Sequence, residues 1–349
     1  MFLLLIFLTL LTYFLGKYTK SLVPFYLLTI VLVIISGFRG ESIGVDTQNY
    51  WAIFNEVNNG GIVLVNELGY LLFIKLITFI GGTQQLIFLI YSIFTILLYN
   101  KFILKYSKDP YFSLLIFVFV GPFFLSSFNQ IRQYLAIAIF LAYLIPLIKN
   151  KQLIKYLVIV VVSTLFIHSS SLLLIPFYFV LNKEISLFKK IFLVIIFNIS
   201  TSFIISIILL SPYRYLILSR AEIEVGTSLF IISIIISFFF LLKQNKISQR
   251  KNEQRIFYNM AYFSIFMIIP IFINNKMPVE IFFRMNNYFF PFIIILLPEL
   301  LERYNKKSKF IVSNMLILFL TLYFFKNSVI LGEVYQLDPY YFNFNLFEY

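Results

Sequence analysis

The sequence predicts an all-helical protein that crosses a membrane about twelve times. Of its 349 residues, 61% are hydrophobic and 12% are charged, whereas soluble domains carry about 25% charged residues. Apolar runs recur along the chain at lengths that suit membrane-spanning helices. The chain has no cysteine and a single histidine, His168, which excludes a disulfide framework and a cysteine- or histidine-rich metal site. We expect neither a metal nor a cofactor, since no phosphate loop or HExxH motif is present.

Twelve apolar runs are the predicted spans, with loose boundaries because several are shorter than the roughly 20 residues that cross a bilayer. They lie at 2–16, 22–38, 84–100, 111–128, 134–148, 156–167, 170–181, 191–210, 227–242, 256–273, 285–300 and 310–325. The first run lacks the basic segment of a signal peptide, so we expect it to be retained as a span. A further run, 67–80, contains Glu67 and Lys75. We interpret it as a short interfacial or re-entrant segment, because counting it as a span would move every later loop to the opposite side.

Positive charge sets the predicted orientation. Six connections fall on one side and hold 20 of the 28 lysines and arginines; they are 17–20, 101–109, 149–155, 182–190, 243–255 and 302–309. Such a bias marks the cytoplasmic side, so both termini are predicted to lie outside. The net charge of +13 is then a property of loops beside a membrane, and we do not expect nucleic-acid binding.

The chain is predicted to be one multi-span domain over 1–349, with polar segments on the outside. These are an outer loop with an interfacial helix at 39–66, outer loops at 211–226 and 274–284, and an outer tail at 326–349. Only three of the 20 inside cations are arginine, but five of the other eight are. Guanidinium binds phosphate or carboxylate through two parallel hydrogen bonds, so we favour an anionic ligand outside. The alternatives are chance in a small sample and snorkelling at helix ends.

The stretch FRGESIGVDTQNYW, residues 38–51, is the most polar of the outer segments. Asp46 is placed to cap a helix that begins at Thr47. That helix suits the outer interface through its aromatic and apolar residues, which are Tyr50, Trp51, Phe54 and Val57. The alternative is that Asp46 only caps and Trp51 only anchors.

Two predicted spans begin at their outer ends with an arginine and polar neighbours at helical spacing. The first carries Asn129, Arg132, Gln133 and Ala136, and the second carries Arg284, Asn287 and Tyr288. An arginine within a span costs roughly 2.5–3.5 kcal/mol on insertion scales, so it usually faces a cavity or a partner. The alternative is a hydrogen-bond network between helices.

His168 lies in LFIHSSSLLLIP, at the tip of a predicted hairpin between Lys155 and Lys183. The intervening residues allow only about 21 Å of helix for each arm, so we expect the tip to be sunk below the outer surface. A histidine followed by three serines at such a tip is a candidate functional group. Arg214, in the loop SPYRYLILSRAEIEVG, either holds a polar ligand or belongs to a solvated face.

These segments resemble the EpsG family of polysaccharide polymerases, which belongs to the Wzy-type proteins. The likeness rests on FRGESIGVDTQNYW, ELGY at 67–70, NQIRQYLAIAIF, LFIHSSSLLLIPFY, RMNNYFFPF and DPYYF, in this order along the chain. The resemblance implies a multi-pass protein of the bacterial plasma membrane that polymerises oligosaccharide repeat units carried on undecaprenyl diphosphate at the outer leaflet. Membrane lipid, a chain-length regulator and a flippase are the other partners it implies.

On this basis we expect glycosyl transfer with the lipid diphosphate as leaving group. Arg132 and Arg284, supported by Arg39, would bind the diphosphate. The base for the acceptor hydroxyl would be Asp46 first, His168 second and Glu67 third. The remaining candidates would orient sugar hydroxyls or phosphate oxygens; they are Tyr50, Asn129, Gln133, Arg214, Asn287 and Tyr288.

Two other functions use a similar substrate. A flippase for lipid-linked oligosaccharide would also have many spans and a cationic cavity, but it should carry buried charges in both halves and often an internal repeat. No repeat is visible, and the polar groups gather at the outer level. A ligase of the O-antigen type would use the same donor with a different acceptor, and only the family resemblance separates it from a polymerase.

Overall fold

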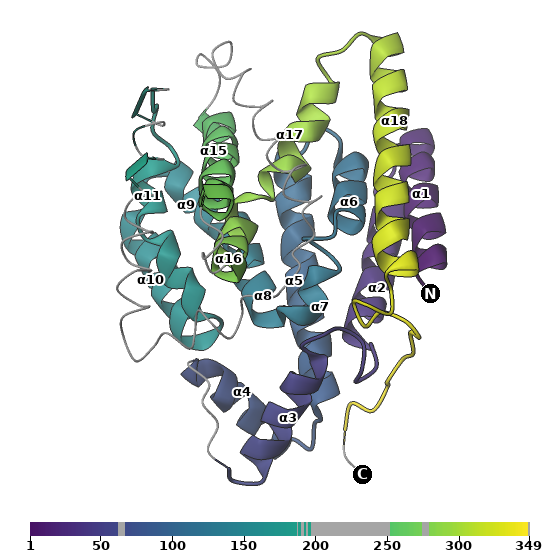
Figure 1. Cartoon of the computed structure of the whole chain (residues 1–349), viewed down its shortest axis with the longest axis vertical. Helices are drawn as coiled ribbons and strands as arrows, with labels where there is room; N and C mark the ends of the chain where they lie inside the picture. The colour runs from purple at the N-terminus through teal and green to yellow at the C-terminus, as the bar shows by residue number, and fades with distance from the viewer. Residues whose placement is uncertain are drawn as a thin grey trace. The chain divides into compact units, whose positions relative to one another are not determined.

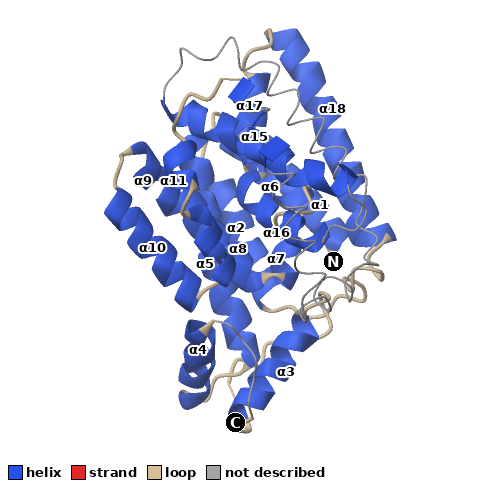
Figure 2. Cartoon of the chain, turned by 60° about the vertical axis from the view of Figure 1, so that its left-hand side comes forward, coloured by secondary structure: helices blue, strands red, loops and turns tan. Residues whose placement is uncertain are grey.

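The structure is a computed structural model of the chain, and it describes residues 1–61, 67–186, 252–273 and 279–347 with a few positions between 188 and 196. Figure 2 shows that the regular elements of the described part are helices. Two isolated β-bridges, Arg39 with Phe342 and Gly82 with Phe347, are the β-pairings among these residues.

Four described helices are long and apolar enough to cross a membrane. They are α1 (Phe2–Thr19), α5 (Gln84–Tyr106), the continuous helix Ile131–Lys149 made of α8 (Ile131–Ile139), a π-helical turn (Phe140–Leu144) and α9 (Ile145–Lys149), and the helix Lys306–Ile330 that begins with α18 (Lys306–Phe325). Several shorter helices are also apolar, among them α2 (Val23–Gly37), α4 (Leu68–Phe79), α6 (Pro110–Phe119), α10 (Leu153–Phe166) and α17 (Phe292–Leu301). A multi-pass membrane protein is therefore plausible, and the number of twelve spans stays a prediction.

Two predicted spans are interrupted at prolines. The run 111–128 divides into α6 and α7 (Ser126–Asn129), and Pro122 lies in the turn between them. The run 285–300 likewise divides between α16 (Val279–Phe289) and α17, with Pro291 in the turn. Proline has no N–H to donate to the preceding helical turn, and its ring clashes with that turn. Hydropathy alone does not register this, so the predicted continuity was wrong at both places. The runs 191–210 and 227–242 lie almost wholly outside the described residues.

The contacts divide the chain into two compact units. Unit 1 comprises 1–147, 153–175 and 294–349, and unit 2 comprises 148–152 and 176–293. Within unit 1, α5 packs along α2, and α1 packs against α2, α6 and α18 (Figure 1). The division does not test the prediction of a single multi-span domain.

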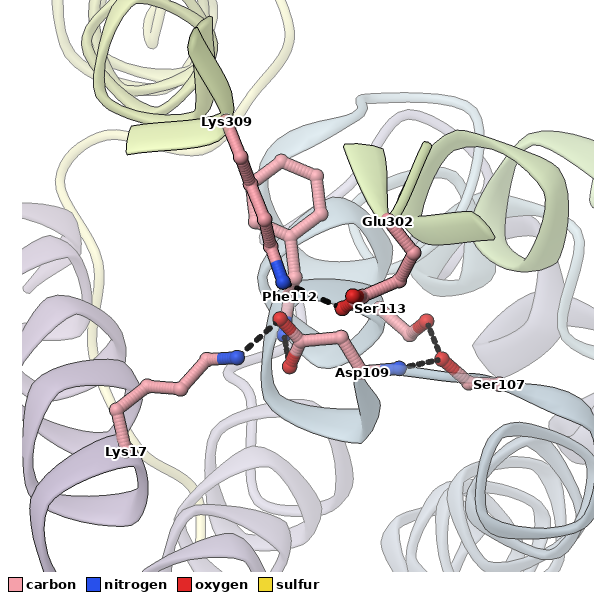
Figure 3. Close-up of polar contacts among 7 residues, drawn as sticks. All are labelled: Lys17, Ser107, Asp109, Phe112, Ser113, Glu302 and Lys309. Atoms are coloured by element: carbon pink, nitrogen blue, oxygen red, sulfur yellow. Dashed lines mark hydrogen bonds and ion pairs between the residues drawn. The ribbon is translucent and has the colours of Figure 1, made fainter. Parts of the chain in front are cut away.

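Figure 3 shows a group of polar contacts within unit 1. Asp109 forms an ion pair with Lys17, and its other oxygen accepts the Phe112 N–H at 3.2 Å, which caps α6. Lys309 forms an ion pair with Glu302 at 2.6 Å. These ion-paired residues all come from connections predicted to be inside.

A C-terminal tail, residues 336–347, contacts two loops that are distant from it in sequence. Three backbone hydrogen bonds connect it to 38–44: Gly40 N–H to Tyr341 O at 2.9 Å, Asn343 N–H to Phe38 O at 2.8 Å and Gly44 N–H to Gln336 O at 2.7 Å. Farther along, Leu346 O accepts from Thr83 N–H at 2.9 Å, beside the start of α5. The tail thus ties the predicted outer loop to the turn that follows α4.

Helix α3 (Thr47–Asn58) forms where the sequence predicts a helix, but its apolar face packs against protein. Tyr50 and Phe54 are buried in a cluster with α4 and α5 residues that include Tyr70 and Phe88, and Trp51 packs against the same cluster. Figures 1 and 2 both show α3 and α4 together. α4 and α5 therefore cover this face, and the position of α3 at the outer membrane interface stays a prediction.

Unit 2 contains α11 (Phe177–Val180), α15 (Asn252–Ile273) and α16. Their aromatic side chains pack together, with ring centroids of Phe177 and Phe289 4.5 Å apart and those of Phe177 and Phe263 5.0 Å apart. An ion pair joins Arg255 to Glu184. Both of its residues belong to connections predicted to be inside.

The tail should be displaced by the substitution Gly40→Ala. A Cβ atom at Gly40 would overlap the ring of Tyr341, and such overpacking costs about 1–3 kcal/mol. We expect a lower melting temperature in detergent and faster proteolysis of a C-terminal epitope. Gly121→Ala is the control, since its Cβ would make an ordinary 3.5 Å contact with the Tyr323 hydroxyl. Equal stability and equal proteolysis of the two variants would contradict the pairing of tail and loop.

Candidate active site at Arg132 and Glu67

Arg132 is the second residue of a long helix. Gln130, with φ −103° and ψ 53°, separates α7 from α8, which begins at Ile131. The helical spacing predicted across Asn129 and Arg132 is therefore wrong, because the two residues lie in different helices. Asn129 instead lies against Gly44, where a Cβ atom would come within 2.7 Å of its Oδ1. Gln133 remains beside Arg132 on α8 and is buried.

Arg132 forms an ion pair with Glu67 that is almost shielded from solvent. Its Nη1 donates to Glu67 Oε2 at 2.6 Å, and the two side chains are 16% and 5% exposed. The other carboxylate oxygen, Oε1, accepts hydrogen bonds from the N–H and the hydroxyl of Ser169, each at 3.0 Å. Three segments distant in sequence thus meet at one carboxylate. Removing one partner of a buried pair is strongly destabilising, because the other charge is left uncompensated.

Tyrosine rings surround the Arg132 guanidinium. Its central carbon lies 4.7 Å from the ring centroid of Tyr70 and 5.9 Å from that of Tyr50, distances that suit cation–π attraction. Tyr70 packs in turn against Tyr91, with centroids 6.3 Å apart. Tyr70 and Ser169 were not predicted as site residues. Tyr70 stands in ELGY with Glu67, and Ser169 directly follows His168, so their place in these two motifs was the sequence signal that could have found them.

The contacts of Ser170 determine which ring nitrogen of neutral His168 carries the proton. The Ser170 N–H donates to its Nδ1 at 3.1 Å, and the Ser170 hydroxyl lies 2.7 Å from the same atom. Because Nδ1 accepts, the neutral imidazole carries its proton on Nε2. The geometry therefore favours donation by His168 over the base role that its sequence context suggested.

Asp46 takes the predicted position before α3, but its side chain makes no capping hydrogen bond. It is partly exposed and close enough to act on Tyr50. Burial raises the pKa of Tyr50, the charge of Arg132 lowers it, and the charge of Asp46 raises it. Tyr50 consequently lies within the electrostatic reach of both the candidate base and the candidate anion-binding residue.

Arg39 lies in the protein interior. Its Nη1 donates to Ser36 O at 2.6 Å and its Nη2 to Phe128 O at 2.9 Å, with the Phe88 ring centroid 4.1 Å from the guanidinium carbon. Burial lowers its pKa to about 10, which leaves it charged at neutral pH. These contacts fix the start of the outer loop on α7, so Arg39 holds the loop in place and does not face a ligand with these donors.

Helix α16 carries Arg284, Asn287 and Tyr288 on consecutive turns, as the spacing predicted. Tyr288 is buried, and the other two side chains are half-buried. They belong to unit 2 and Arg132 belongs to unit 1, so their convergence with Arg132 stays a prediction. Arg214 lies outside the described residues. Among the described residues, no three histidine, aspartate or glutamate side chains are grouped so that they could hold a metal ion.

The model of the EpsG family matches residues 22–342 of this chain, a range that contains the segments on which the resemblance rests. No curated protein and no solved structure matches it.

The ion pair makes stability depend on pH in the acid range. Burial acts to raise the pKa of Glu67, but the hydrogen bonds from Ser169 and the charge of Arg132 outweigh it, so the pKa is lowered from 4.5. A carboxylate with a lowered folded-state pKa contributes stability that is fully present above its unfolded-state pKa and is lost as pH falls through the folded-state value. Wild type should therefore melt at a higher temperature than Glu67→Gln at pH 7, and the gap should close below 4.5.

The control for this measurement is Glu56→Gln, which removes an exposed carboxylate from α3. It should melt like wild type throughout the pH series. A gap between wild type and Glu67→Gln that persisted unchanged in strong acid would show that the carboxylate charge is not the source of the stabilisation.

Proposed function

Because this chain belongs to the EpsG family, which indicates a membrane protein of polysaccharide biosynthesis, we propose that it polymerises lipid-linked oligosaccharide repeat units. The reaction is glycosyl transfer at the outer face of the bacterial plasma membrane, with undecaprenyl diphosphate as leaving group. The observation that carries the proposal is Arg132, a guanidinium enclosed by tyrosine rings and paired with a carboxylate at the start of a long apolar helix.

The distribution of contacts supports an outward-facing site. The residues around Arg132 come from segments predicted to lie at the outer level: Asp46 and Tyr50 from the loop after α2, Glu67, and Ser169 from the hairpin tip. Loops predicted to be inside make their ion pairs with one another instead. A site on the outside fits a substrate that is displayed at the outer leaflet.

In the proposed reaction, an acceptor hydroxyl attacks the anomeric carbon of the donor sugar. The bond between that carbon and the phosphate oxygen breaks, and undecaprenyl diphosphate leaves with the electron pair. Arg132 stabilises the charge that grows on the leaving oxygen, as preorganised donors do in other transfer reactions. Each charge-assisted hydrogen bond contributes roughly 1.5–3 kcal/mol. The reaction needs no nucleotide, because the lipid diphosphate is already an activated leaving group.

Asp46 is the proposed base that takes the acceptor proton. A base must approach the acceptor on the side of the sugar opposite the leaving group, and Asp46 and Arg132 both act electrostatically on Tyr50 without an ion pair to each other among the described residues. Glu67 is less suited, since it contacts Arg132 directly. His168 donates a hydrogen bond to the substrate. Asn129 and Gln133 orient sugars or phosphate beside Arg132, and Arg39 holds the loop in place through its backbone partners. Arg214, Arg284, Asn287 and Tyr288 stay predicted substrate-binding residues.

Arg132→Lys should lose most polymer although the charge is retained, because an ammonium group lacks the planar fork that grips phosphate. The measurement is the glycan profile of a chromosomal deletion complemented at matched protein levels. Single lipid-linked repeat units should accumulate and be accessible from outside. Arg303→Lys, in an i,i+4 pair with Glu299 at a predicted inside loop, is the control and should restore polymer. Units trapped on the cytoplasmic side would indicate a flippase, and near-normal polymer would refute the role of Arg132.

Asp46→Asn should abolish polymerisation, because an amide cannot take the proton of the acceptor hydroxyl. His168→Ala should reduce polymer less severely, since it removes a donor and leaves the base in place. Both are read in the same complementation experiment, with Glu41→Gln as the exposed carboxylate control. Full polymer length in Asp46→Asn would transfer the base role to another residue.

A further inference from the structure

The hydrogen bonds to Glu67 come from groups that are well suited to bind phosphate. Its carboxylate receives a guanidinium N–H from Arg132 at 2.6 Å and both the N–H and the hydroxyl of Ser169 at 3.0 Å. Phosphate oxygens accept hydrogen bonds from the same kinds of group, and arginine serves both anions with similar geometry. The carboxylate thus occupies a small anion site that the protein fills with one of its own side chains.

Arg132 retains donor capacity in this arrangement. A guanidinium has five N–H donors, and the Nε of Arg132 is buried without a hydrogen-bond partner among the residues that the structure describes. The aromatic rings of Tyr50 and Tyr70 lie alongside it. In such surroundings charges interact more strongly than in water. A diphosphate and the Glu67 carboxylate would therefore repel each other if both contacted Arg132.

We propose that Glu67 holds the place of the donor diphosphate while the site is empty. The arriving diphosphate takes over Arg132 and the Ser169 donors, and the carboxylate returns to them as undecaprenyl diphosphate leaves. Glu67 is then an internal competitor, and Ser169 is a further phosphate-binding residue. This inference rests on the proposed function, because the anion concerned is the leaving group of that reaction.

The exchange would keep the site from being blocked by its own product. Undecaprenyl diphosphate carries the same headgroup as the donor, so a site that binds the donor tightly through Arg132 also binds the product tightly. A carboxylate that competes for the same guanidinium lowers the affinity for both. The lowered pKa of Glu67 keeps the competitor ionised at neutral pH.

The test is the affinity of the purified full chain in detergent for inorganic pyrophosphate and for farnesyl diphosphate, measured by calorimetry. Glu67→Gln keeps the shape of the side chain and removes its charge, so both ligands should bind at least about tenfold more tightly, a change of about 1.4 kcal/mol. Glu56→Gln, which changes an exposed carboxylate of α3, should bind like wild type. Unchanged or weaker binding by Glu67→Gln overturns the exchange.

A second variant covers the case in which Glu67→Gln does not fold. Glu67→Asp keeps the charge but shortens the side chain by one methylene, so it should no longer reach Arg132 and should also bind both ligands more tightly. Ser169→Ala, which loses the hydroxyl donor, should weaken binding several-fold. An affinity for pyrophosphate that is the same in Glu67→Asp and wild type overturns the exchange, and full affinity in Ser169→Ala removes Ser169 from the site.

The glycan profile separates this inference from the function on which it rests. If Arg132→Ala still makes polymer in cells, the proposed diphosphate site is wrong and the exchange falls with it. If Arg132→Ala stops polymerisation but Glu67→Gln leaves the pyrophosphate affinity unchanged, only the exchange is wrong. Product inhibition is a third measurement: added undecaprenyl diphosphate should inhibit polymerisation by Glu67→Gln at a lower concentration than polymerisation by wild type.

Discussion

The ion pair between Arg132 and Glu67 is the contact on which the candidate site depends. An arginine near the end of an apolar helix must find an opposite charge or water, and here it finds a carboxylate that also holds the hairpin tip through Ser169. Because the pair is mostly buried, its two members constrain each other's position strongly. The tyrosine rings that pack on the guanidinium then follow from the same need to enclose the charge.

Arg39 solves a similar problem in a different way. It has no carboxylate partner among the described residues, and its donors are used by the backbone carbonyls of Ser36 and Phe128. Its planar group also lies on the Phe88 ring. Two arginines of the same predicted outer level are therefore held differently. Arg39 fixes a loop to the helices, and Arg132 keeps an Nε without a hydrogen-bond partner among the described residues.

The pattern of apolar residues along the chain predicted most of the helices, whereas the candidate site is formed by contacts between residues that are distant in sequence. Apolar runs identified α1, α2, α5 and α18, because hydropathy is a property of neighbouring residues. The break at Pro122 was missed because the run 111–128 is largely apolar on both sides of it, and the break at Gln130 was missed because Asn129 and Arg132 stand at helical spacing. Partners such as Glu67 for Arg132 and Ser169 for Glu67 are 65 and 102 residues apart. Spacing along one helix carries no information about them, although the motifs in which they stand were recognisable.

The C-terminal tail has a consequence for the biosynthesis of the protein. It pairs with the loop that carries Asp46, and the contact of Ser42 with Tyr341 joins positions 299 residues apart. Chains are made from the N-terminus, and early segments begin to fold first. The loop after α2 therefore lacks its hydrogen bonds to the tail until the ribosome has produced residues 336–343. Assembly of this face consequently depends on synthesis of residues 336–347, and a chain that stopped before them would contain every helix of the site without the tail segment that pairs with the loop.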